Sequence, residues 1–337
     1  MQQKHAPRPL PLFLELVRMV SEREPQLAAK ALQGLASYEN ALRAQPRQPG
    51  PVLAQCGAAT IRDHGGAGPP AVLVPSLFNP PGILDLDSES SLADAVKRIG
   101  RRTLLVDWGK ADERRGLSIS DHVETMLVPL LREIGEPAAL AGYCLGGTMA
   151  MGAANLAPVE RVVTLAAPWN FDGYPQEARN SLDHLWTNAG LAAGEFGALP
   201  MEVLQSAFWS LDPRRTVAKF ARFAELPAGS PDAKRFVTLE DWANEGDPLP
   251  FPAARELIED FFGRNLPGSG AWRIGAVEMT DRLACPLLNI TASNDRITPA
   301  AAAPAGAAVR IQSGHVGMVV GSARARLHQE LANFLGG

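Results

Sequence analysis

The chain has 337 residues, of which 46% are hydrophobic and 20% charged, a globular composition that excludes long-range disorder. Its 32 basic and 36 acidic residues give a net charge of −4, so no basic excess exists to neutralise phosphates, and nucleic acid is excluded as the main partner. No run of 18 apolar residues occurs, which predicts that no segment spans a membrane.

The first predicted elements are helical. Apolar residues recur at helical spacing through residues 12–44, and Pro25 should split this stretch into two helices. Residues 45–51 are rich in proline and glycine and are predicted to form a linker. Residues 1–50 are therefore expected to be an N-terminal helical region with its linker, and residues 52–62 a strand or hairpin arm.

Short apolar strands then alternate with helices. The strands are predicted at residues 71–77, 103–108, 138–143 and 161–166. The helices are predicted at residues 91–99, 118–134 and 146–154. Pro129 should kink the second of these helices. This alternation predicts a parallel sheet with crossover helices, which is an α/β fold.

The alternation breaks near Pro168. Residues 169–271 show a helical, Trp-rich pattern without a buried strand, and an insertion of roughly 100 residues is too long for a loop. We therefore expect this segment to form a helical lid or cap. The core is expected to comprise residues 51–168 and 272–337. The second part would contain strands and a last helix, at residues 286–291, 308–312 and 322–334.

The most specific motif is Gly-Tyr-Cys-Leu-Gly-Gly at residues 142–147, where a predicted strand meets a predicted helix. It is the nucleophile-elbow pattern with cysteine in place of serine. The nucleophile Cys144 would occupy a tight turn, in which a Cβ two residues away would crowd the neighbouring strand or helix. The N–H of Leu145 would point to the developing oxyanion, and the helix N-terminus favours a thiolate.

Such a nucleophile needs an acid and a histidine, which follow it in that chain order. Asp295 lies after the strand predicted at residues 286–291, and His315 lies after the next strand. We expect His315 to deprotonate Cys144 as general base and Asp295 to orient and stabilise the imidazole. A structural cysteine in a tight turn is the alternative, which the positions of the acid and the histidine disfavour.

The second oxyanion donor is expected in the loop after the first central strand, at residues 75–86. The backbone N–H of either Leu77 or Phe78 is the candidate, and the sequence does not choose between them.

The remaining cysteines, Cys56 and Cys285, have no such context and are predicted to be small buried residues. Three cysteines at wide spacings suggest neither a disulfide framework nor a metal site, so no metal is expected. A reducing, cytoplasmic setting is predicted. His122 is interpreted as a surface or helix-cap residue.

These motifs resemble those of the polyhydroxyalkanoate synthase family. Residues 142–148 look like its lipase-like box, and residues 79–86 resemble its oxyanion-side loop. Residues 294–299 and 314–317 are similar to its Asp and His segments. The resemblance covers roughly residues 70–335, and the chain length is similar to that of the short catalytic subunit of the two-component class. It implies an α/β-hydrolase fold, a mostly parallel sheet flanked by helices, with the lid inserted.

The resemblance also implies an activity. The family polymerises 3-hydroxyacyl-coenzyme A into polyhydroxyalkanoate through a covalent acyl-cysteine, with the thioester as substrate and no cofactor. Substrate binding is assigned to Asn79, Tyr143 and Arg296. The implied partners are the polyester granule and an accessory synthase subunit, and a homodimer or hetero-oligomer is expected. The chain would be cytoplasmic and associated with granules.

Two other functions stay open. The family usually has an aromatic residue where this chain has Leu77 and a histidine where it has Arg296. These departures favour a thioesterase, an esterase or an intracellular polyester depolymerase on the same scaffold. A non-catalytic granule-binding or subunit-binding protein is the third hypothesis. Its binding face would be apolar and would consist of Phe13, Leu16, Val17 and Val20.

Overall fold

The computed structural model describes residues 5–336, which form two compact units. One unit combines the chain up to Pro46 with Pro200–Gly246, and the other contains Arg47–Leu199 and the chain from Asp247 onward. Residues 200–246, expected in the lid, thus group with the N-terminal helices. The role of residues 169–271 as a lid stays a prediction. Among the described residues, no helix has the length and apolar character needed to cross a bilayer.

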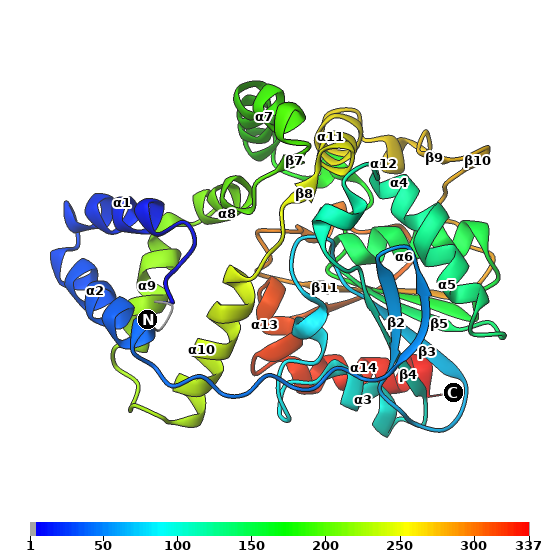
Figure 1. The fold of residues 1–337 in the computed structure, drawn as a ribbon, viewed down its shortest axis with the longest axis horizontal. Coiled ribbons are helices and arrows are strands. Elements are labelled where there is room, and N and C mark those ends of the chain that lie inside the picture. The colour runs from blue at the N-terminus through cyan, green and yellow to red at the C-terminus, as the bar shows by residue number, and fades with distance from the viewer. Residues whose placement is uncertain (1–4, 337) are drawn as a thin grey trace. The chain divides into compact units, whose positions relative to one another are not determined.

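The larger unit is built on a sheet that has eight strands within the described residues, in the order β1-β2-β4-β3-β5-β6-β11-β12 (Figure 1). The strand pairs β1–β2 and β2–β4 are antiparallel, and all the others in this sheet are parallel. The predicted, mostly parallel α/β sheet is therefore confirmed. The strands are β1 (Val52–Cys56), β2 (Ala59–Asp63), β3 (Pro70–Val74), β4 (Arg102–Asp107), β5 (Ala139–Tyr143), β6 (Arg161–Leu165), β11 (Leu287–Ala292) and β12 (Ala307–Ile311).

Helices cover both faces of this sheet (Figure 1). The chain moves in one direction from β3 to β4 and in the other from β4 through β5 to β6, so right-handed crossovers place the connecting helices on opposite faces. One face carries α3 (Leu92–Arg98) and α14 (Arg324–Leu335). The opposite face carries α4 (Ile119–His122), α5 (Val128–Arg132) and α6 (Leu145–Leu156). Strands β3 and β5 are buried at every residue, as expected between two helical layers.

The helix predicted at residues 118–134 is present, but one of its turns is wider than an α-helical turn. A π-helical turn at Val123–Leu127 separates α4 from α5 and ends just before Pro129. Proline has no N–H to donate and crowds the preceding turn. The disturbance expected at this proline therefore coincides with a wider turn in the helix.

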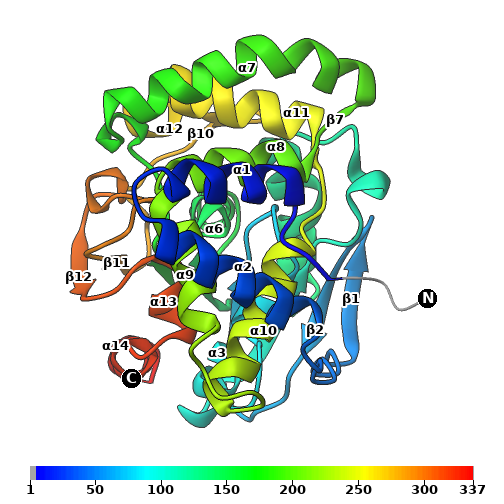
Figure 2. The same ribbon diagram turned by 90° about the vertical axis from the view of Figure 1, so that its left-hand side faces the viewer.

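The segments of this unit between β6 and β11 are mainly helical. Helices α7 (Gln176–Phe196) and α11 (Phe251–Arg255) lie side by side (Figure 2), and α11 continues as a π-helical turn at Glu256–Gly263. Buried Glu256 accepts hydrogen bonds from Ser120 N (2.9 Å) and Trp272 Nε1 (3.1 Å), which fastens this turn to α4. The shorter elements are β7 (Ala198–Leu199), β8 (Leu249–Pro250), α12 (Leu266–Ser269), β9 (Arg273–Ile274) and β10 (Val277–Glu278).

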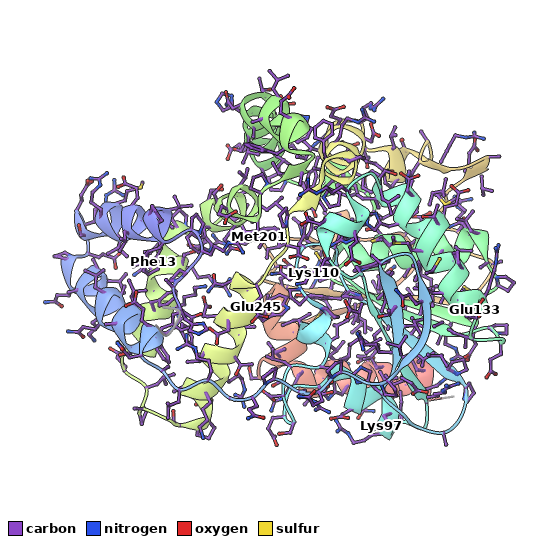
Figure 3. The ribbon with its side chains drawn as sticks, viewed as in Figure 1. Phe13, Lys97, Lys110, Glu133, Met201 and Glu245 are labelled. Atoms are coloured by element: carbon purple, nitrogen blue, oxygen red, sulfur yellow. The ribbon has the colours of Figure 1, made fainter. Side chains whose placement is uncertain are left out.

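The smaller unit is helical. It contains α1 (Leu10–Ser21), α2 (Pro25–Glu39), α8 (Met201–Ser210), α9 (Pro213–Phe223) and α10 (Pro231–Asn244), and the break predicted at Pro25 is confirmed. Phe13 is fully buried against Phe220 in its core (Figure 3). A Cβ at Gly34 would overlap the Phe220 carbonyl, so glycine permits the close approach of α2 and α9. Most of the apolar face suggested for granule binding is buried in this core, namely Phe13, Leu16 and Val17.

Candidate active site

Cys144 lies in a strained turn between β5 and α6. Its φ of 56° and ψ of −131° are unusual for a residue with a side chain. The turn is fixed by two backbone hydrogen bonds of 2.9 Å, from Cys144 N to Leu165 O and from Gly147 N to Cys144 O. The thiol side chain is thus held at the carboxyl end of the sheet and at the N-terminus of a helix.

Three glycines make this turn possible. A Cβ at Gly142 would overlap the backbone of Gly147, and one at Gly147 would overlap Ala167. A Cβ at Gly146 would overlap the backbone of Val74 and Pro75, at the end of β3. The crowding expected around Cys144 is therefore present, and the loop that follows β3 lies directly against the turn.

His315 and Asp295 come from the loops after the last two strands. His315 begins α13 (His315–Val320), and its Nδ1 lies 2.7 Å from Asp295 Oδ2. The other oxygen, Oδ1, accepts the N–H groups of Ile297 and Thr298, each at 2.8 Å. An ionised carboxylate only accepts hydrogen bonds, so Nδ1 donates to Asp295 and Nε2 is the ring nitrogen that does not face the acid.

Electrostatics favour the protonated form of His315. Burial alone would lower its pKa, but the negative charges of Cys144 and Asp295, together with the hydrogen bond to Asp295, raise it to about 10. A histidine with a raised pKa firmly holds a proton that it has taken from a thiol. His315 and Asp295 thus form a buried hydrogen-bonded pair, and the charge of Cys144 acts on His315. The joint catalytic role of the three residues stays a prediction.

Two buried tyrosines lie close to these residues. The ring centroids of Tyr143 and His315 are 5.0 Å apart, and within the described part of the chain the Tyr143 hydroxyl has no hydrogen-bond partner. Tyr174, which no sequence pattern singled out, follows a short 3-10 helix (Phe171–Gly173) and packs its ring against Phe171 and Phe262. Burial raises the pKa of both tyrosines, and the charges of Cys144 and Asp295 add to this effect.

The residues predicted to supply the oxyanion donors lie close to the turn at Cys144, and their role stays a prediction. Leu145 is the first residue of α6, immediately after Cys144. Val74 pairs with Gly142 across β3 and β5, so the chain two or three residues beyond β3 is level with Cys144. Leu77 and Phe78 occupy this loop and are both buried. Asn79 is half-buried and Arg296 exposed, and their assignment to substrate binding stays a prediction.

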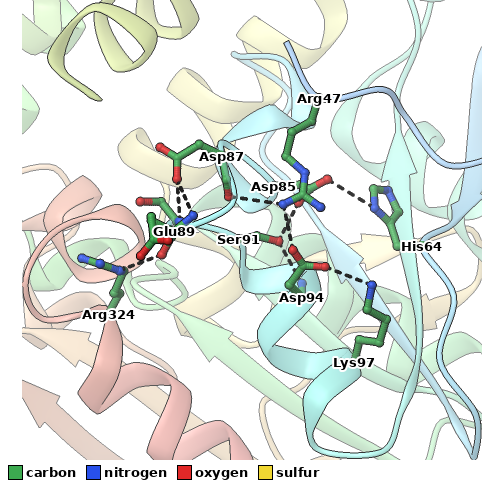
Figure 4. Close-up of polar contacts among 10 residues, drawn as sticks. Arg47, His64, Asp85, Asp87, Glu89, Ser91, Asp94, Lys97 and Arg324 are labelled. Atoms are coloured by element: carbon green, nitrogen blue, oxygen red, sulfur yellow. Dashed lines mark hydrogen bonds and ion pairs between the residues drawn. The ribbon is translucent and has the colours of Figure 1, made fainter. Parts of the chain in front are cut away.

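The far end of this loop is held by a polar cluster (Figure 4). Buried Asp85 follows a 3-10 helix (Pro81–Leu84) and accepts a 2.5 Å hydrogen bond from Ser91 Oγ. The same carboxylate pairs with Arg47 at 3.2 Å and with His64 at 3.3 Å. The return of the loop to α3 is thereby fixed.

The near end of the loop contacts a buried arginine–histidine pair. His122 is fully buried, so its placement on the surface was wrong. Its Nδ1 lies 2.6 Å from Ser118 O and must carry the hydrogen, which leaves Nε2 to accept from Arg114 Nη1 at 3.2 Å. Arg114 Nη2 also donates to Leu77 O at 3.4 Å. No sequence pattern indicated this pair, because an isolated arginine is expected on the surface.

Acid is expected to destabilise the protein through His122. Burial lowers its pKa to about 4; the bond to Ser118 opposes this shift and the charge of Arg114 adds to it. Between the unfolded pKa of about 6.5 and this value, the unfolded chain binds a proton that the folded chain does not, so the free energy of unfolding falls as pH falls. The free energy of unfolding, measured by urea denaturation between pH 7 and pH 4, should fall less for His122→Gln than for the wild type. If the free energy of unfolding fell equally with pH in the two proteins, the expectation would be contradicted.

The fold is that of the α/β hydrolases. A hydrolase from Pseudomonas aeruginosa PA01 matches with a TM-score of 0.50 and 16% identity, over 83% of this chain and 94% of that one. An α/β hydrolase fold protein from Nakamurella multipartita matches with a TM-score of 0.50 and 16% identity, over 84% of this chain and 98% of that one. The predicted fold class is confirmed. No protein-family profile matches the chain.

Sequence similarity is more specific. The chain is 28% identical to the poly(3-hydroxyalkanoate) polymerase subunit PhaC of Allochromatium vinosum, over 68% of this chain and 67% of that one. The PhaC subunit of Synechocystis is 26% identical, over 79% of this chain and 77% of that one. That of Haloferax mediterranei is 27% identical over 68% of this chain, but this match spans only 49% of the relative. The resemblance to the polyhydroxyalkanoate synthases is thereby confirmed.

Proposed function

We propose that this chain is an acyltransferase that polymerises 3-hydroxyacyl groups from coenzyme A thioesters into polyhydroxyalkanoate. The similarity to PhaC subunits supports the polymerase activity. The observation that carries the mechanism is the strained turn that presents Cys144 beside the hydrogen-bonded pair of His315 and Asp295. No metal or organic cofactor enters the proposal.

The first half of the reaction acylates Cys144. His315 Nε2 accepts the thiol proton, and Sγ attacks the thioester carbonyl carbon. The N–H of Leu145 and one N–H from the loop after β3 stabilise the oxyanion. The carbon–sulfur bond to coenzyme A then breaks, and the departing sulfur takes the proton from His315. The products are free coenzyme A and an acyl-cysteine.

The second half transfers the acyl group to an alcohol. The hydroxyl of another 3-hydroxyacyl unit attacks the acyl-cysteine while His315 accepts its proton, so that an ester bond forms and Cys144 is released. Cysteine suits this task because exchange of one thioester for another loses little driving force. Water must be excluded during transfer, and the aromatic side chains of Phe171, Tyr174 and Phe262 pack together near the acid loop. We propose granule association, an accessory subunit and an oligomer as features of the same function.

The test is incubation with 3-hydroxybutyryl-coenzyme A, in which thiol release, polymer and free 3-hydroxybutyrate are followed together. We expect thiol release accompanied by polymer. Free acid without polymer, alone and after addition of an accessory synthase subunit, would mean that water is the acceptor and would replace the proposal with a thioesterase. No acylation of Cys144 by the thioester would contradict both.

A further inference from the structure

Arg114 occupies an unusual place for a charged side chain. It ends a 3-10 helix (Ala111–Arg114) and is only 3% exposed, yet within residues 5–336 it makes no ion pair. Asp247 and Asp107 act on it only at longer range, and burial lowers its pKa to about 10. Its hydrogen-bond partners among the described residues are neutral acceptors, His122 Nε2 and Leu77 O. Burying a cation in this way is costly, so a contribution to stability is a poor explanation for it.

The contact with Leu77 O fixes the plane of one peptide group. The carbonyl of Leu77 and the N–H of Phe78 belong to the same planar trans peptide and point in opposite directions. When Arg114 holds the carbonyl on one side, the N–H of Phe78 is directed to the other side. His122 sets the position of the guanidinium, because its own orientation is fixed by the bond to Ser118 O.

A second side chain that contacts His122 donates a hydrogen bond to the loop two residues before Leu77. Trp108 is 3% exposed, and its Nε1 donates to Pro75 O at 3.0 Å. The Trp108 ring meets the His122 ring edge-on, with centroids 5.9 Å apart. Two carbonyls of the loop, those of Pro75 and Leu77, are thus held by side chains that support one another.

We propose that Arg114, supported by His122, is a positioning residue that orients the Phe78 N–H as the second oxyanion donor. This inference rests on the proposed acyl transfer, and it selects Phe78 where the sequence left Leu77 and Phe78 open. Arg114 does not touch the substrate in this role. It acts through the Leu77–Phe78 peptide, and its effect is confined to reactions in which an oxyanion forms.

The test compares two reactions of the same sulfur. Acylation of Cys144 by 3-hydroxybutyryl-coenzyme A or by p-nitrophenyl butyrate passes through an oxyanion, whereas alkylation by iodoacetamide does not. For Arg114→Met we expect acylation to slow by about 10- to 100-fold and alkylation, followed by peptide mass, to change by less than about threefold. Arg115→Met is the matched control, because Arg115 is exposed and pairs with Asp112; it should leave both rates unchanged.

A pair of variants at His122 keeps the test valid if Arg114→Met does not fold. Glutamine can accept from Arg114 and donate to Ser118 O, whereas leucine can do neither. His122→Gln should therefore retain acylation close to the wild-type rate, and His122→Leu should lose it, with alkylation retained in both. Equal acylation in the two variants, or parallel loss of acylation and alkylation in folded protein, would overturn the proposal.

The outcomes also separate this inference from the proposed function. If the p-nitrophenyl ester acylates wild-type Cys144 and the thioester does not, the polymerase proposal fails while the Arg114 comparison still decides the positioning role. If neither donor acylates Cys144, no oxyanion is formed and both proposals are overturned.

Discussion

Cys144→Ala is expected to lower the rate of coenzyme A release from 3-hydroxybutyryl-coenzyme A by at least about 10⁴-fold. The substitution removes the sulfur that attacks the thioester and leaves His315, Asp295 and the oxyanion donors in place. Alanine also has a Cβ, so the unusual backbone angles of this position are neither relieved nor made worse. The remaining groups then have no nucleophile in reach, and water would have to take its place.

The measurement is the initial rate of thiol release, with circular dichroism as a check on folding. Cys285→Ala is the matched control, because Cys285 is a free cysteine outside the strained turn and its loss should leave the rate unchanged. A rate close to that of the wild type for Cys144→Ala would contradict the covalent mechanism while leaving the fold assignment intact.

The geometry of the candidate site at the carboxyl end of the sheet could be predicted because its signals are local. Gly142, Gly146 and Gly147 are required by backbone contacts that a short motif encodes, and the structure shows each of those contacts. Asp295 and His315 could be placed because parallel strands bring their carboxyl ends to one edge, so that residues far apart in sequence meet there.

Residues that act through tertiary contacts could not be predicted in this way. His122 has the spacing of an ordinary helical residue, and only the fold shows that Arg114 is buried against it. Tyr174 lies in a stretch without clear periodicity, and its ring packs against Phe262, a residue far away in the sequence. Burial of a polar side chain depends on the whole fold, which composition and periodicity do not report.

Local sequence patterns also could not predict which helices pack together. Helix α9 is separated from α1 and α2 by most of the sheet in sequence, yet it shares a core with them through Phe220 and Gly34. Amphipathic periodicity shows that a helix has an apolar face but not which partner covers that face. The segment at residues 200–246 was therefore expected to belong with the neighbouring parts of the insertion, whereas it packs with α1 and α2.

Asp295→Asn is expected to slow the acylation of Cys144 by about 10³- to 10⁴-fold without unfolding the site. Oδ1 of Asp295 accepts the N–H groups of Ile297 and Thr298, so the amide oxygen of asparagine would keep this position. The amide NH2 would then face His315 Nδ1 and donate to it. Nδ1 becomes an acceptor, and the imidazole hydrogen moves to Nε2, the atom that must take the proton from Cys144.

The asparagine keeps the hydrogen bonds from the backbone N–H groups of Ile297 and Thr298, so the slower acylation should not be accompanied by a loss of stability. The midpoint of urea unfolding should shift little, whereas acylation by 3-hydroxybutyryl-coenzyme A should fall steeply. Asp281→Asn is the matched control, since Asp281 accepts the N–H of Ala305 at 3.0 Å instead of the imidazole, and acylation should continue at the wild-type rate. If Asp295→Asn is acylated within about threefold of the wild-type rate, the tautomer of His315 is not set by Asp295, and a different base must be sought for Cys144.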